Sequence, residues 1–179
     1  MLIPGKIVKK FISKKGKEIV IRYPKWEDLD EFTRYINKLS QEDTLIIFSG
    51  EEIKKEEEAK TLSQWFYQME IGDKVVLGCF YGNKLVAVAN VDRDFSDLKR
   101  SRHVGIFGIS VEKEFRGEGV GYELGKAIIE EVKKEDQGIK NGDFGCVFIK
   151  RQSSKSLSKI RFQRSRPPSK KNPLPRFLY

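Results

Sequence analysis

Apolar residues follow two different spacings in the first part of the chain. The runs 7–12 and 18–23 flank the polar turn Lys14-Lys15-Gly16 and have the composition of two short strands. From Pro24 onward the apolar positions recur at helical intervals and predict a helix that ends near Leu39. After a connector over 43–53, the same spacing predicts a second helix over about 54–70. Two tryptophans of this region are expected in the core: Trp26 and Trp65.

The second part of the chain returns to strand-like patterns. Residues 74–81 and 84–91 flank the turn pair Gly82-Asn83 and predict a β-hairpin. A charged loop over 92–102 leads to a strand over 103–111, in which Gly105 and Gly108 suggest a bulge or a close backbone approach. A final amphipathic helix is expected over about 120–134. This mixture of strands and helices predicts an α/β protein.

Composition narrows the classes of protein without naming one. The chain has 179 residues, 39 % of them hydrophobic, which suits one domain with its own core. No apolar run is long enough for a membrane span or a signal peptide, so we expect a soluble, cytoplasmic protein. Cys79 and Cys146 fit no metal motif and are expected to be ordinary apolar residues. His103 is the single histidine, and we expect no metal site.

The net charge of +9 lies entirely in the last part of the sequence. Residues 141–179 contain ten Lys/Arg and one acid, whereas the basic and acidic residues of 1–140 balance. We therefore divide the chain into a domain over 1–140 and a basic tail over 141–179. Such a tail suits nucleic-acid binding. A catalytically weak or inactive domain that carries an RNA-binding tail is accordingly the alternative function.

The segment 109–121 carries the chemistry. It reads I-S-V-E-K-E-F-R-G-E-G-V-G, a strand end, a glycine-rich turn and the first residues of a helix. Such a turn gathers backbone N–H groups beside the positive end of a helix dipole, which suits a pyrophosphate. The dinucleotide pattern G-x-G-x-x-G fails at Tyr122, and the P-loop pattern fails at Val120 and Ala127. The pattern that fits is R-x-x-G-x-G.

Here the chain resembles the GNAT N-acetyltransferases, over roughly residues 18–140. The resemblance implies a mixed, mostly antiparallel GNAT sheet flanked by helices, with the last part of that fold missing or disordered in this chain. The matching positions are Ile109, Val111, Phe115, Arg116, Gly117, Gly119, Val120 and Gly121.

The resemblance also implies an activity and a cosubstrate. Acetyl-CoA would transfer its acetyl group directly to a primary amine in a ternary complex, and the acceptor would be a small molecule or a protein N-terminus or lysine. Pantetheine would pair with the backbone near Ile109 and Val111, and a backbone N–H near Val111 would stabilise the oxyanion. A homodimer is compatible with the family, and a membrane partner is not expected. The pyrophosphate would lie on the segment Arg116, Gly117, Glu118, Gly119, Val120 and Gly121.

The general base is open between several residues. Asp92, placed after the second hairpin strand, and His103 are the candidates, although each also suits an ordinary surface position. Glu51 and Glu52 could face a cationic substrate or simply begin a helix. A tyrosine commonly protonates the leaving thiolate in the family.

Residues 141–179 depart from the family, which continues with a strand, a helix and a closing hairpin. They contain six serines and four prolines and show no periodicity. When each codon is read one base later from Lys140, one permitted decoding is KMVILGVFSSNAKAVKAYQKLGFKEVG. That translated sequence contains the missing strand and helix, with the family's Asn at the Lys150 position and its Tyr at the Leu157 position. We hypothesise a one-base frameshift near Lys140, which would leave the printed chain destabilised and weakly active or inactive.

Overall fold

The structure, a computed structural model, describes residues 3–42, 52–93 and 105–135. Two short 3-10 helices, η1 (Trp26–Asp28) and η2 (Lys113–Phe115), precede the first and the last α-helix. The order of elements is the predicted one, and the α/β class is confirmed. The strands and α-helices are β1 (Ile7–Ile12), β2 (Glu18–Arg22), α1 (Leu29–Ser40), α2 (Lys55–Glu70), β3 (Lys74–Tyr81), β4 (Lys84–Arg93), β5 (Gly105–Val111) and α3 (Val120–Glu135).

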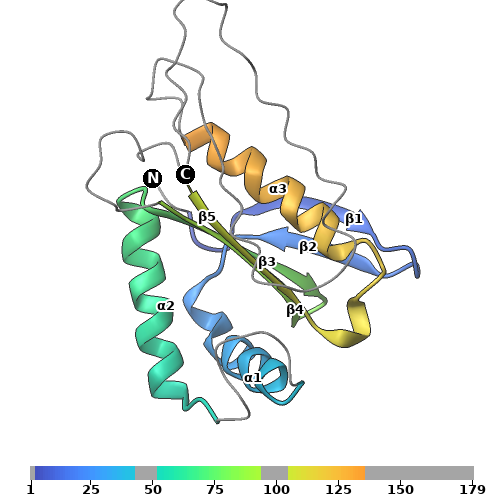
Figure 1. Cartoon of the computed structure of the whole chain (residues 1–179), viewed down its shortest axis with the longest axis horizontal. Coiled ribbons are helices and arrows are strands. Elements are labelled where there is room, and N and C mark those ends of the chain that lie inside the picture. The colour runs from blue at the N-terminus through green and yellow to red at the C-terminus, as the bar shows by residue number, and fades with distance from the viewer. Residues whose placement is uncertain (1–2, 43–51, 94–104, 136–179) are drawn as a thin grey trace, which may run out of the picture.

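The five strands form one sheet in the order in which they occur along the chain (Figure 1). Every strand pair within the described residues is antiparallel. β3 and β4 are joined by the predicted turn, where Gly82 has a φ of +57° that favours glycine. Residues 43–51 of the predicted connector, residues 94–102 of the predicted loop, His103 at the start of the predicted strand, and residues 136–179, which include Cys146, lie outside the described residues.

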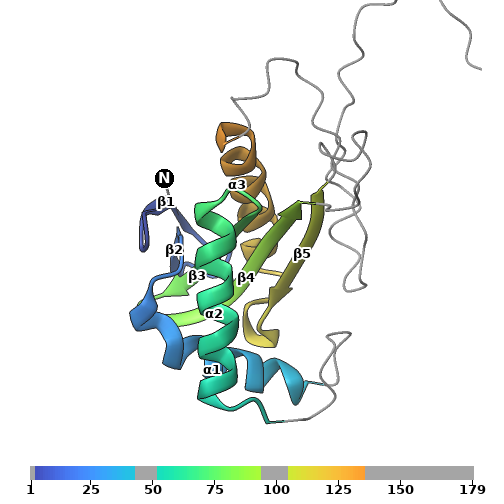
Figure 2. The ribbon, with the colours of Figure 1, turned by 90° about the vertical axis from the view of Figure 1, so that its left-hand side faces the viewer.

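Helices cover both faces of this sheet, and Figures 1 and 2 show α3 on one side with α1 and α2 on the other. Side chains alternate along a strand, so neighbouring residues of β5 face opposite layers. Tyr35 of α1 reaches Ser110 Oγ with its hydroxyl at 2.9 Å, whereas Ile109 and Val111 lie near Gly121 of α3. No helix of the described ranges is long and apolar enough to cross a membrane.

The core lies between the sheet and these helices. The apolar residues of α3 recur at helical spacing and lie on its buried side, as predicted. Cys79 is fully buried on β3, also as predicted. Burying one such aliphatic side chain contributes roughly 1.5–3 kcal/mol before conformational entropy is subtracted. The buried stripe of α3 comprises Val120, Leu124, Ala127, Ile128 and Val132.

Three details differ from the prediction. Trp26 is 49 % exposed and rests against Phe66, because it lies in η1 at the margin of the helical layer. Asp92 belongs to β4, since that strand continues to Arg93 and pairs Asp92 with Ile106. β4 and β5 keep a continuous register, so Gly108 marks no bulge. A Cβ there would instead lie 2.6 Å from the Asn90 side-chain oxygen.

Candidate functional site

The glycine-rich loop lies where β5 gives way to α3. Gly117 and Gly119 have φ values of +77° and +90°, a region that L side chains rarely adopt. α3 begins at Val120, and the first N–H groups of a helix have no acceptor within it. Among the described residues, the N–H groups of Gly117, Gly119 and Gly121 donate no hydrogen bond to another backbone group. The loop therefore offers several amide donors at the positive end of a helix dipole.

The start of α3 packs directly on the end of β5. A Cβ added at Gly121 would lie 3.4 Å from Val111 Cγ2 and 3.9 Å from Ile109 Cδ1. Within the described ranges β5 pairs only with β4, so its other edge has no strand neighbour there. The loop amides and the outer edge of β5 thus adjoin each other, and an extended ligand can follow the strand while its anionic group meets the loop.

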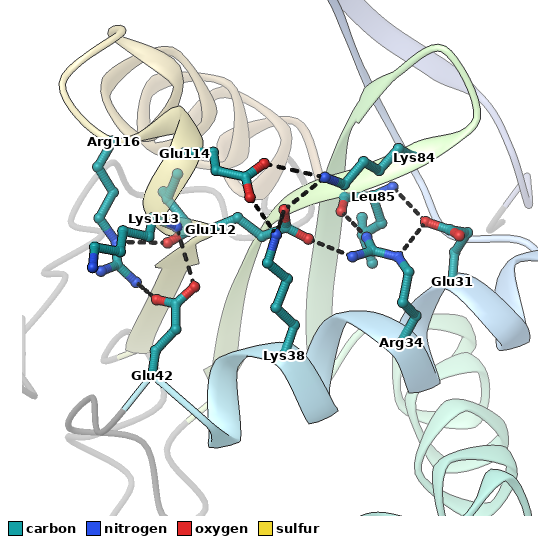
Figure 3. A network of polar contacts seen from close by, with 11 residues as sticks. Glu31, Arg34, Lys38, Glu42, Lys84, Leu85, Glu112, Lys113, Glu114 and Arg116 are labelled. Atoms are coloured by element: carbon teal, nitrogen blue, oxygen red, sulfur yellow. Dashed lines mark hydrogen bonds and ion pairs between the residues drawn. The ribbon is translucent and has the colours of Figure 1, made fainter.

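A buried carboxylate fixes the beginning of this loop. Glu112, fully buried just after β5, accepts hydrogen bonds from Arg34 at 2.6 Å and from Lys38 at 3.2 Å (Figure 3). Lys84, the first residue of β4, lies 3.2 Å from the same carboxylate. Burial alone would raise the pKa of Glu112, but the hydrogen bonds from these cations hold it below its ordinary value. The carboxylate therefore ties the loop to α1 and to the β3–β4 hairpin.

The arginine of the motif points back over the strand. Arg116 Nε donates to the Val111 carbonyl oxygen at 2.8 Å, and the guanidinium pairs with Glu42 at the end of α1 (Figure 3). Glu42 also accepts from the Lys113 N–H. The sequence predicts Arg116 as the cation beside a pyrophosphate. In this structure its guanidinium contacts Glu42 and the Val111 carbonyl, and the role beside a pyrophosphate stays a prediction.

The acid of the motif is buried at the other end of the loop. The Glu118 side chain is 1 % exposed and accepts from Ser13 Oγ and Lys17 Nζ, each at 2.9 Å. Lys15 Nζ lies 3.2 Å away, and the Glu118 carbonyl accepts from the Lys14 N–H at 3.0 Å. The hydrogen bond from Lys17 lowers the pKa of Glu118. Glu118 thus joins the loop to the β1–β2 turn.

Comparison with known proteins identifies the family. A sequence model of the acetyltransferase (GNAT) family matches residues 27–142, more than half of the chain. The chain belongs to this family. The match covers β5, the glycine-rich loop and α3, as the R-x-x-G-x-G pattern predicts. No curated protein matches the sequence.

Solved GNAT structures share the fold. An acetyltransferase of the GNAT family from Streptococcus pneumoniae is 24 % identical, with a TM-score of 0.56 over 65 % of this chain and 68 % of its own. The GNAT domain of PAT from S. lividans is 15 % identical, with a TM-score of 0.59 over 71 % and 72 %. yncA of Salmonella typhimurium, solved with its cofactor acetyl-CoA, is 16 % identical, with a TM-score of 0.53 over 65 % and 64 %. The predicted GNAT fold is confirmed.

The candidate base of this GNAT domain is already paired. Asp92 forms an ion pair with Lys74 of β3 and accepts a hydrogen bond from the Asn90 side chain. These three residues lie on the face of the sheet that α1 and α2 cover, beside Trp65, whose ring centroid is 5.6 Å from Lys74 Nζ. The role of Asp92 as a base stays a prediction.

None of the other candidate residues is seen beside Asp92 in the described part of the chain. His103 and Glu51 lie outside the described residues, and Glu52 is exposed just before α2. The Tyr35 hydroxyl contacts Ser110 on the same face of the sheet as Asn90, and its burial raises its pKa. The sequence patterns did not mark Tyr35, Glu112 or Ser13 as residues of a functional site. A charged residue directly after an apolar strand was the only sequence signal for Glu112.

Proposed function

We propose that this GNAT acetyltransferase moves an acetyl group from acetyl-CoA directly to a primary amine, with both substrates bound together. The observation that carries the proposal is the loop of residues 116–121, where the N–H groups of Gly117, Gly119 and Gly121 donate to no backbone group of the described residues and lie beside the outer edge of β5. The amides of Gly117, Gly119 and Gly121 would hold the pyrophosphate, and the backbone of Ile109 and Val111 would hold pantetheine. The amine nitrogen would attack the thioester carbonyl carbon of acetyl-CoA, the C–S bond would break, and CoA would leave as a thiolate that is then protonated. The proton that the amine loses would pass to a base.

The face of β4 and β5 under α1 and α2 is the place we propose for the acceptor. Asn90, Asp92 and Ser110 put oxygen atoms on that face, and Gly108 leaves room for the Asn90 side chain. Because Lys74 already pairs with Asp92, an amine has to share or displace that lysine before Asp92 can take its proton. A small or flexible primary amine suits this arrangement better than a bulky one.

A thermal shift with acetyl-CoA tests the cosubstrate. Acetyl-CoA should raise the melting temperature of the full chain, whereas ATP at the same concentration should not. The variant Gly119→Ala should lose this shift, because a side chain at a φ of +90° distorts the loop. The matched control is Gly72→Ala, which places the same side chain at a φ of +78° in the α2–β3 turn.

Both glycine variants should be destabilised to a similar extent, by about 1–2 kcal/mol. Only Gly119→Ala should lose the response to acetyl-CoA. A wild-type chain that shows no shift with acetyl-CoA, or an equal shift with ATP, overturns the proposal. Release of the CoA thiol in the presence of a panel of primary amines then identifies the acceptor.

We further propose that the acetyltransferase domain ends near residue 140 in this chain and that a one-base frameshift produces the amino-acid sequence of residues 141–179. The family match ends at residue 142, close to where the charge composition changes. Resequencing the gene across the codons for Asp136 to Gly145 tests this. A missing or extra base supports the shifted translation and a complete GNAT enzyme. A gene whose reading frame encodes residues 141–179 as given rules out a sequencing error.

A further inference from the structure

We propose that Lys14, on the turn between β1 and β2, binds a phosphate group of acetyl-CoA beside the glycine-rich loop. This inference rests on the proposed function and assigns a ligand contact to a residue more than a hundred positions before the motif. The group that Lys14 would contact is a phosphate in the ADP half of acetyl-CoA. Two phosphate groups qualify, the pyrophosphate and the 3′-phosphate.

The position of Lys14 carries the inference. Its Cε lies 4.0 Å from the place where a Cβ on Gly119 would stand, so the lysine stem lies over the second glycine of the loop. Its N–H donates to the Glu118 carbonyl at 3.0 Å, which fixes the backbone of the turn against the loop. An ammonium group at this place is within reach of an anion held by the loop amides.

The lysine is also unpaired, unlike its neighbours. Lys15 and Lys17 both face the buried Glu118 carboxylate, at 3.2 Å and 2.9 Å. Lys14 is exposed and forms no ion pair within the described part of the chain. The turn and Glu118 together carry three lysines and one acid, which leaves two positive charges in excess. An excess of that sign attracts a phosphate.

The turn is held rigidly enough to present this charge. Ser13 Oγ donates to Glu118 and accepts from the N–H groups of Lys15 and Lys17, each at 3.3 Å. Lys17 Nζ additionally lies 4.0 Å from the centroid of the Phe115 ring. Because the turn is ordered before a ligand arrives, less conformational entropy is lost on binding.

The motif arginine leaves this role open. Arg116 is bound to the Val111 carbonyl and to Glu42, so its guanidinium is directed toward α1 rather than toward Gly119. A cation from another element can therefore contribute to the phosphate site, and the Lys14 side chain lies against Gly119 of the loop without an acid as partner among the described residues.

Calorimetric binding to the full chain tests the inference with three variants. Lys14→Gln should weaken acetyl-CoA binding about tenfold, because it removes one charge-assisted contact. Lys14→Arg should retain most of the affinity. Lys10→Gln is the matched control, since Lys10 is an exposed lysine of β1 in the same hairpin, and its affinity should be unchanged.

Three ligands separate the sources of the effect. With acetyl-pantetheine, which lacks the ADP half, Lys14→Gln and wild type should bind equally. With acetyl-dephospho-CoA, a remaining tenfold loss assigns Lys14 to the pyrophosphate, and a vanished loss assigns it to the 3′-phosphate. Raising the salt concentration should narrow the difference between Lys14→Gln and wild type.

Two outcomes overturn the inference, and they are distinguishable. Wild type that binds acetyl-CoA while Lys14→Gln binds it as tightly as Lys10→Gln overturns the role of Lys14 and leaves the proposed function standing. Wild type that does not bind acetyl-CoA overturns both. An unchanged melting temperature of ligand-free Lys14→Gln shows that a loss of affinity is not a loss of folding.

Discussion

A buried carboxylate holds each end of the glycine-rich loop, and the two carboxylates are bound by different sets of side chains. Glu112, at the start of the loop, is bound by one arginine and two lysines that come from α1 and from the start of β4. Glu118, at its end, is bound by two lysines and a serine of a single turn. The side chains of both acids are almost completely buried.

This difference separates two tasks. The cations around Glu112 come from the helical layer and the sheet, and they are shared with the exposed Glu114 and the half-buried Glu31, so the cluster joins the main parts of the domain (Figure 3). The groups around Glu118 belong to one hairpin, so they position that hairpin against the loop. The buried Glu118 of the proposed phosphate loop is thereby neutralised by Lys15 and Lys17, and Lys14 takes no part in this.

The largest expected effect is at the Glu112 end. Glu112→Ala should lower the free energy of unfolding by about 3 kcal/mol, because it leaves three partly buried cations facing one another. Urea unfolding measures this loss. The control is Glu114→Ala, which removes a 61 % exposed carboxylate from the same cluster and should leave stability almost unchanged. Equal losses in the two variants would show that burial at Glu112 is unimportant.

At the Glu118 end we expect a smaller loss of stability. In Glu118→Ala the freed ammonium of Lys15, already 65 % exposed, can turn into water, so the melting temperature should fall less than in Glu112→Ala. A double-mutant cycle with Lys17→Ala isolates the direct contact. The double variant should lose less than the sum of the single variants, and strict additivity would argue against the contact.

The smallest effect is a dependence on pH. Because the folded-state pKa of Glu112 is lowered, its ion pairs contribute fully above the ordinary carboxyl value of 4.5 and are lost as the pH falls through the lower folded value. The stability advantage of wild type over Glu112→Gln should therefore be constant near neutral pH and shrink in acid. Urea unfolding between pH 7 and pH 3 measures it, and an advantage that grows in acid would contradict the assignment.

Much of the fold follows from local patterns in the sequence. The turn at Gly82-Asn83 specifies the β3–β4 hairpin, and the apolar spacing specifies α3, because these features need only neighbouring residues. The glycines of the loop are equally local, since Gly117 and Gly119 occupy conformations that other residues disfavour. For this reason the family and the fold could be predicted before the structure.

The partners within the site could not be predicted in this way. Arg34 and Glu112 are 78 positions apart, and Ser13 and Glu118 are 105 apart, so no local spacing connects them. Asp92 was placed in a loop because its polar neighbours hide the end of β4. Gly108 was predicted to mark a bulge or a close approach to the backbone. The register has no bulge there, and the group that approaches Gly108 closely is the Asn90 side chain of the neighbouring strand.

The arrangement of the sheet has a consequence for how the site is assembled. Among the described elements, β3, β4 and β5 follow one another along the chain, whereas β2 and β3 are separated by α1 and α2. Pairings between sequence neighbours form earlier than those that close long loops. We therefore expect the glycine-rich loop to form with β3–β5 and α3, and the β1–β2 hairpin to dock afterwards. Folding then delivers Lys14 last, so the phosphate site gains its charge only when the domain is complete.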